Sequence, residues 1–88
     1  MPGPWVDMLA AENQFLRAEL RAGLTFSRIA LRSKQESKVE RNRVNARKAY
    51  EALLRFIPGT KLSEESAREI NSEMAQLKAD LRQLGEDV

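Results

Sequence analysis

The fold is decided by residues 46–70, ARKAYEALLRFIPGTKLSEESAREI, where two helical patterns flank the dipeptide Pro58-Gly59. Proline disfavours helical geometry in the residue that precedes it, and glycine permits the backbone conformations of a turn. Apolar residues recur at helical spacings of three, four or seven positions on both sides. They are Val39, Ala46, Tyr50, Leu53 and Ile57 upstream and Ala67, Ile70, Met74, Leu77, Leu81, Leu84 and Val88 downstream. Each pattern predicts an amphipathic helix. Because two apolar faces are stabilised by packing together, the stretch predicts an antiparallel helical hairpin.

Capping residues predict the ends of these two helices. Ser63 is a good N-cap for the later helix, and the two glutamates that follow it lie at the favourable end of the helix dipole. Gly85 is placed to end that helix. We therefore expect helices over about residues 38–57 and 64–85.

An earlier helix is predicted over about residues 5–32, because a broad apolar arc continues through this segment. Its members are Trp5, Met8, Leu9, Phe15, Leu16, Leu20, Leu24, Phe26, Ala30 and Leu31. Gly23 lies within the arc and costs about 1 kcal/mol relative to alanine in a helix. We expect either a bend there or the close approach of another backbone.

The connection between the first two helices leaves two architectures open. Ser33 and Ser37 each begin a Ser-x-x-Glu capping box, which favours a turn over residues 33–37 and a new helix after it. No residue there forbids a single long helix. The sequence thus predicts an all-α fold in one domain, residues 1–88, as a three-helix up-down-up bundle or a helical hairpin with an extended N-terminal helix.

Composition argues against catalysis. The chain has 88 residues and contains neither cysteine nor histidine, which removes the usual nucleophile–base pairs and zinc ligands. Glu12 and Glu19 lie seven residues apart and could act as paired carboxylates, but pairing with a nearby arginine such as Arg17 or Arg21 is a simpler interpretation. We predict no enzymatic activity, no cofactor and no bound metal.

The start of the chain lacks the basic and apolar regions of a secretory signal, and no segment approaches the roughly 20 apolar residues that span a bilayer. These observations predict a cytoplasmic protein without a membrane partner.

The apolar arc of the first helix is wider than one hairpin covers, which predicts protein–protein interaction or self-assembly. A homodimer is the expected form, and another protein partner stays open. The residues expected at the interface are Trp5, Phe15, Leu16, Leu20 and Phe26. Leu9, Asn13, Leu16 and Leu20 also approximate a short zipper seam between chains, although the same leucines could belong to the bundle's own core.

The uneven distribution of charge suggests an alternative function. The net charge is only +2, but residues 28–48 hold eight basic residues and two acidic ones, whereas residues 62–88 hold three basic and seven acidic ones. A basic stripe can bind the phosphate backbone of nucleic acid, with an affinity that falls as salt rises. The candidate residues for nucleic-acid binding are Lys34, Lys38, Arg41 and Lys48. The other interpretation is a solvated outer helix face.

Residues 40–44, ERNRV, followed by residues 57–63, IPGTKLS, resemble a basic helix-loop-helix segment of eukaryotic transcription factors. The resemblance implies that Glu40 would read bases and that Arg41 and Arg43 would hold phosphates. Val44 departs from the family, which usually has a second adjacent arginine at this position.

Ala46, Tyr50, Leu53 and Pro58 are similar to the second helix of a tetratricopeptide repeat. The resemblance covers roughly residues 42–58 and implies that Ala46 and Tyr50 pack against neighbouring helices; the first-helix signature of the repeat is missing. The segment from residue 46 through the following helix is also similar to small bacterial helical proteins without an assigned function, and that similarity implies no activity.

Overall fold

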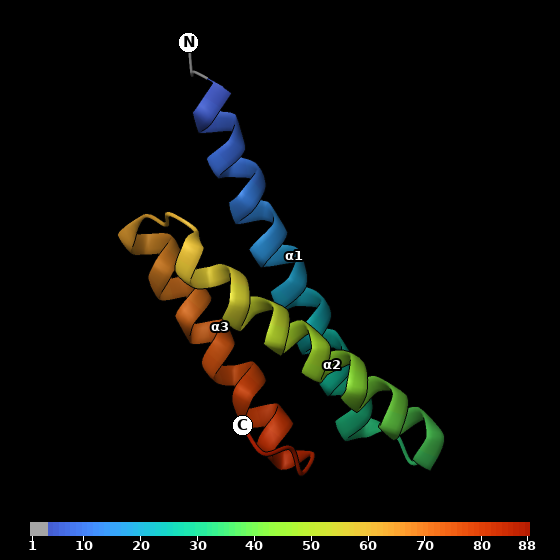
Figure 1. Ribbon diagram of the computed structural model, residues 1–88. Helices are drawn as coiled ribbons and strands as arrows, with labels where there is room; N and C mark the ends of the chain where they lie inside the picture. The colour runs from blue at the N-terminus through green and yellow to red at the C-terminus, as the bar shows by residue number, and fades with distance from the viewer. Residues whose placement is uncertain (1–3) are drawn as a thin grey trace.

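Three antiparallel helices make up the computed structural model, which describes residues 4–88 and the side chains of residues 12–88. Helix α1 spans Pro4–Arg32, α2 spans Glu36–Phe56, the short 3-10 turn η1 spans Ile57–Gly59, and α3 spans Glu64–Gln83. The helices run up, down and up, and the first turns of α1 extend past the level of the α2–α3 connection (Figure 1). The predicted all-α, three-helix fold is confirmed, with its helix ends within about two residues of those expected.

The connection between α1 and α2 is a turn, so the alternative of one long helix is wrong. The chain leaves helical geometry over residues 33–35, and Gln35 has an extended backbone with φ −91° and ψ 118°. The backbone N–H of Gln35 donates to the Ser33 hydroxyl at 3.2 Å, which tightens the turn. Neither predicted capping box forms, because α2 begins at Glu36 and has no side-chain cap.

The start of α3 is as the sequence predicted. Ser63 is the N-cap residue, and its hydroxyl accepts a hydrogen bond from the Ser66 N–H at 3.1 Å. This bond satisfies one of the amides that the first turn of a helix leaves free.

Gly85 ends α3, also as predicted, with a positive φ of 93°. The N–H of Glu86 donates to the carbonyl of Leu81 at 2.9 Å, and the N–H of Gly85 donates to the carbonyl of Arg82 at 3.0 Å. This pair of bonds is a Schellman motif, which turns the chain sharply after the helix. The residues after Gly85 are therefore directed back across the bundle.

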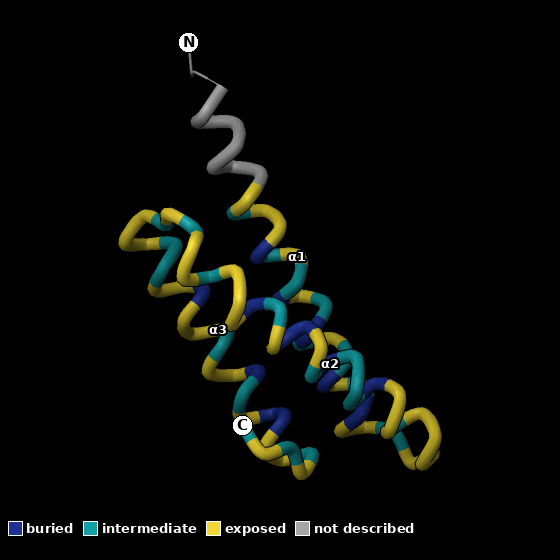
Figure 2. The backbone as a smooth tube through the Cα atoms, in the orientation of Figure 1, coloured by how far each residue is buried: buried dark blue, intermediate teal, exposed yellow. Residues whose placement is uncertain are grey.

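The core lies where the three helices pack. Its residues alternate spacings of three and four along α1 and α2, and α3 keeps the same spacing once the half-buried Met74 is included. This spacing keeps one stripe of each helix turned inward (Figure 2). The buried stripes comprise Leu16, Leu20, Gly23, Ser27 and Ala30 of α1, Asn42, Ala46, Ala49 and Leu53 of α2, and Ile70, Leu77 and Leu81 of α3. Tyr50 is also buried, so the packing of Ala46 and Tyr50 against neighbouring helices is observed.

Gly23 is a point of tight packing between the helices. A Cβ atom at this position would lie 2.9 Å from Cδ2 of Leu77 and 3.2 Å from Cβ of Ala49. Side chains of two other helices therefore pack against the position of the missing side chain, where another backbone was one of the two expectations. The contacts with Ala49 and Leu77 place α2 and α3 on adjacent sides of α1.

Candidate protein interaction face

Helices α1 and α2 form an antiparallel pair, and α3 covers one side of it. Arg17 of α1 pairs with Glu69 of α3 at 2.8 Å, and Arg43 of α2 pairs with Glu86, which follows α3. With 3.6 residues per turn, positions about half a turn from these contacts lie on the opposite side of the pair. We call this side the outer face. Its apolar members are Phe15, Ala18, Ala22, Phe26 and Ile29 of α1 and Ala52 and Phe56 of α2.

An aromatic pair dominates the outer face. The rings of Phe15 and Phe56 meet edge to face, with centroids 5.5 Å apart and planes at 89°, and each residue is 46% exposed. Together with Glu12 and Arg55 they line a surface hollow of about 440 Å³. Edge-to-face geometry is favourable for aromatic rings, but the half of each ring that faces water gains nothing from it. The pair is thus an apolar surface that a partner could cover.

Small side chains occupy much of the rest of the outer face. Ala18 is exposed, and Ala22 and Ala52 are half-buried. Short side chains let another helix approach closely, because no long side chain holds its backbone away. The face combines two large aromatic residues with flat alanine surface, which suits helix-on-helix packing.

The structure revises the predicted interface residues. Leu16 and Leu20 are 0% exposed and belong to the core of this chain, so they cannot contact a partner in this fold. They face inward because they lie on the stripe that packs between α2 and α3, whereas Phe15 lies about a quarter turn away. Phe26 is half-buried against the core. The side chain of Trp5 lies outside the described residues.

The predicted zipper seam is also revised where its residues are described. The side-chain oxygen of Asn13 accepts a hydrogen bond from Nε of Arg17 at 3.0 Å, and Leu16 and Leu20 are buried. These three positions therefore serve the chain's own bundle. The side chain of Leu9 lies outside the described residues.

Sequence reasoning missed Phe56. It lies three residues after Leu53, where the buried stripe of α2 would continue, but the sequence pattern was extended to Ile57 instead. The spacing of three from Leu53 was the available signal.

The predicted nucleic-acid-binding residues Lys34, Lys38, Arg41 and Lys48 are all exposed, and none forms an ion pair with a described residue. Lys34 belongs to the α1–α2 connection and not to the helix face on which it was expected. Arg41 and Lys48 are seven residues apart, as are Lys48 and Arg55, so these three lie in a line along the α2 edge of the outer face.

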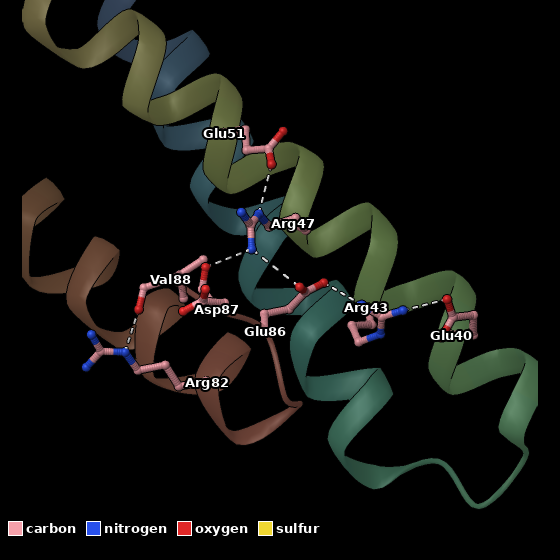
Figure 3. Close-up of polar contacts among 8 residues, drawn as sticks. All are labelled: Glu40, Arg43, Arg47, Glu51, Arg82, Glu86, Asp87 and Val88. Atoms are coloured by element: carbon pink, nitrogen blue, oxygen red, sulfur yellow. Dashed lines mark hydrogen bonds and ion pairs between the residues drawn. The ribbon is translucent and has the colours of Figure 1, made fainter.

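Arg43 and Arg47 contribute to a different structure. Glu86 lies between them, and its two carboxylate oxygens accept hydrogen bonds from the two guanidinium groups, at 3.3 Å in the case of Arg47 (Figure 3). The side chain of Glu86 is only 16% exposed. These bonds hold the segment after α3 against α2, and we call them the C-terminal clasp.

Glutamates on α2 flank the clasp. Arg43 also binds Glu40, and its hydrogen bond and positive charge lower the pKa of that carboxyl group. The same hydrogen bond raises the pKa of the Arg43 guanidinium. Arg47 pairs with Glu51 at 2.8 Å. Glu40 and Arg43, to which the helix-loop-helix resemblance gives DNA-binding roles, are thus bound to each other here.

A buried polar contact joins α1 to α3 on the covered side. The Ser27 hydroxyl donates to Oδ2 of Asp80 at 2.8 Å, and the side-chain amide of Gln76 donates to Oδ1 at 2.9 Å. Asp80 is only 6% exposed. Sequence reasoning missed this contact, because nothing in the spacing of Ser27 and Asp80 brings them together before the helices pack.

Among the described residues, neither Glu12 nor Glu19 forms an ion pair with Arg17 or Arg21, and Arg17 binds Glu69 of α3 instead. Within the described part of the chain, no group of three acidic residues is arranged to hold a metal ion. In the same part of the chain, no helix combines the length and apolarity that crossing a membrane requires.

Comparison of the chain with protein-family models, curated proteins and solved structures found no match. The resemblances to a tetratricopeptide repeat and to a basic helix-loop-helix segment therefore stay predictions. The exposed surfaces of the bundle are therefore the features that bear on its function.

Proposed function

We propose that this protein is a helical interaction module that self-associates through its outer face. The observation that carries the proposal is the Phe15–Phe56 pair, which lies on the side that α3 leaves uncovered and exposes about half of each residue. Burying a whole phenylalanine side chain contributes about 1.5 to 3 kcal/mol, so burying the exposed half contributes about 1 kcal/mol. Four such rings in a dimer contribute about 4 kcal/mol, which is half of the 8 kcal/mol of a micromolar complex.

The size and composition of the bundle support the same proposal. A chain of 88 residues buries only about 60 to 65% of the surface that its unfolded form exposes. The core positions of α1 and α2 include Gly23, Ser27, Ala46 and Ala49, which add little apolar area. A second copy packed on the outer face would enlarge the apolar core.

The outer face is also large enough for a stable interface. The molecule measures 51 Å by 18 Å by 18 Å, so one long side has a projected area of roughly 900 Å². Stable protein–protein interfaces bury about 800 Å² on each partner. Side-by-side packing along the long axis therefore reaches the required area, whereas end-to-end packing does not.

The experiment is mass measurement by light scattering at two micromolar concentrations and at low and high salt. We expect a dimer that persists at high salt, because apolar burial drives it, and we expect Phe15→Asp and Phe56→Asp to give monomers. Leu54→Asp is the matched control, since Leu54 is 52% exposed on α2 but faces the α2–α3 groove. Circular dichroism checks that each variant remains helical. A monomeric parent protein, or a dimer that Phe15→Asp leaves intact, would contradict the proposal.

Nucleic-acid binding is a second candidate, because Lys34, Lys38, Arg41 and Lys48 are exposed and unpaired within the described residues. Fluorescence polarisation with labelled duplex DNA and RNA tests it. Binding should weaken as salt rises, and Lys38→Glu combined with Arg41→Glu should abolish it. The candidate fails if binding is absent at low salt or is unchanged by the double substitution.

A further inference from the structure

The groove between α2 and α3 is a second exposed apolar surface of the bundle. It has a volume of about 270 Å³ and is lined by Tyr50, Leu54, Ile57 and Pro58 on one wall and by Asn71, Met74, Ala75 and Lys78 of α3 on the other. Leu54 is 52% exposed at its edge. Leu54 lies two residues after Ala52 of the outer face, about 200° further around α2. The groove is therefore a separate surface on the opposite side of that helix.

Short side chains on α3 leave this groove open. Asn71 and Ala75 lie one helical turn apart, and both are exposed, so neither covers Leu54 from the other wall. Sites for small molecules have volumes of about 300 to 1,000 Å³ and enclose most of the ligand. The α2–α3 groove is smaller and has a half-exposed leucine at its edge. These features favour the side chains of a packed protein segment over a whole small molecule.

The length of the groove fits a helix. The residues that line it run from Tyr50 to Pro58 on one wall and from Asn71 to Lys78 on the other, which is about two helical turns, or roughly 10 Å, on each wall. A helix that binds in a groove presents apolar side chains at positions i, i+3 or i+4, and i+7. These positions span the same two turns. Such a helix would pack on α2 and α3 as a fourth member of the bundle.

The charge of the groove restricts which helix fits. Lys78 is the one charged residue among those that line the groove; it is half-buried and forms no ion pair with a described residue. Glu51, which follows Tyr50 on α2, is bound to Arg47. A helix that covered the groove would remove the Lys78 ammonium group from water, which is costly unless an acid pairs with it.

From this combination of apolar walls and an unpaired cation we infer that the α2–α3 groove binds an amphipathic helix of another protein, with acidic residues beside its apolar face. The inference goes beyond the proposed self-association, because it uses a different surface and a different partner. A carboxylate of the bound helix would pair with Lys78, and its apolar side chains would cover Leu54 and Met74.

Fluorescence polarisation with two labelled synthetic helices tests this inference. Both peptides have leucine at positions i, i+3 and i+7; one has glutamate beside the leucines, and the other has lysine at the same positions. The parent protein should bind the acidic peptide at least about tenfold more tightly than the basic one, because only the acidic peptide pairs with Lys78. Equal binding of the two peptides, or no binding of the acidic peptide at millimolar concentration, would overturn the inference.

Charge reversal at the groove supplies the sharper test. Lys78→Glu should bind the basic peptide more tightly than the acidic one, and a gain in affinity for one peptide cannot come from unfolding. Lys48→Glu makes the same change of charge at an exposed position of α2 that does not line the groove, so this control should keep the preference for the acidic peptide. Leu54→Asp should weaken binding of the acidic peptide, because it places a like charge in the groove. A preference that Lys78→Glu leaves unchanged would contradict the inference.

The outcomes separate this inference from the proposed function. Phe15→Asp changes the outer face alone, so it should abolish the dimer and leave binding of the acidic peptide unchanged. A parent protein that is monomeric but binds the acidic peptide through Lys78 removes the proposed function and keeps this inference. A dimer that binds neither peptide keeps the proposed function and overturns the inferred partner.

Discussion

The two sides of the α1–α2 pair differ although the same two helices build them. On the side that α3 covers, Ser27 binds Asp80 and Leu77 fills the space beside Gly23. Among the described residues, no buried side-chain nitrogen or oxygen lacks a hydrogen-bond partner. On the outer face, by contrast, an aromatic pair stays half in water, and Arg41 and Lys48 have no ion-pair partner among the described residues. The covered side is therefore satisfied within this chain, whereas the outer face keeps apolar and charged groups exposed to water.

The largest loss of stability should come from creating a cavity on the side that α3 covers. Leu77 is fully buried, and Leu77→Ala leaves a cavity beside Gly23 that costs about 2 to 5 kcal/mol of unfolding free energy. Urea denaturation followed by circular dichroism measures it. Ile29→Ala, which also truncates an aliphatic side chain but at a half-buried position on the outer face, should cost less. Equal losses would mean that the two faces are not as different as their burial indicates.

Removing the buried hydrogen bond between Ser27 and Asp80 should cause the next largest loss of stability. Ser27→Ala removes one of the two hydrogen bonds to Asp80, which stays 6% exposed, and the loss should be about 1 to 3 kcal/mol. A double-mutant cycle with Asp80→Asn separates this bond from simple packing changes. Additive free energies in the cycle would show that the two side chains do not interact.

Replacing the glycine in the turn after α3 should cause a smaller loss of stability. Gly85 has φ +93°, where a Cβ atom is strained, so Gly85→Ala should cost about 1 to 2 kcal/mol. No neighbouring atom would lie near the added Cβ, so the loss would reflect the backbone alone. Gly59→Ala, whose added Cβ is equally free of contacts, is the control and should be close to neutral. The denaturation midpoint measures both changes, and equal midpoints for the two variants would contradict the prediction.

The smallest effect should be the pH dependence of the exposed Glu40–Arg43 pair. The hydrogen bond from Arg43 lowers the pKa of Glu40 in the folded state, so the pair stabilises the fold above the carboxyl group's ordinary pKa of 4.5. That stabilisation disappears as pH falls through the lowered pKa, because the protonated carboxyl loses its charge. The difference in urea midpoint between the parent protein and Glu40→Gln should therefore be present at pH 7 and vanish at acidic pH. A difference that stays constant across this range would rule out the pair as its source.

The helices themselves could be predicted from local chemistry. Pro58, Ser63 and Gly85 act on the backbone within a few residues, so the α2–α3 connection and both ends of α3 were found from the sequence. The α1–α2 turn was found, but its capping boxes were not formed. The Ser33 hydroxyl accepts from the amide two residues on, where a capping box needs the third.

The site was only partly predictable, because sequence spacing does not say which part of a wide apolar arc turns inward. Phe15 and Leu16 are neighbours in the sequence, yet one is 46% exposed and the other is fully buried. The arc of α1 fits several orientations about its own axis. The position of α3 selects one of them and thereby determines which residues remain for an interface.

The sequence by itself determined an all-α fold and the approximate ends of its helices, because these follow from propensities and spacings along one chain. Only the tertiary structure decided that Phe15 meets Phe56, that Ser27 meets Asp80, and that Glu86 closes the C-terminal clasp on Arg43 and Arg47. These contacts join residues about 40 to 53 positions apart. The rotation and register of packed helices, and not any local pattern, bring such residues together.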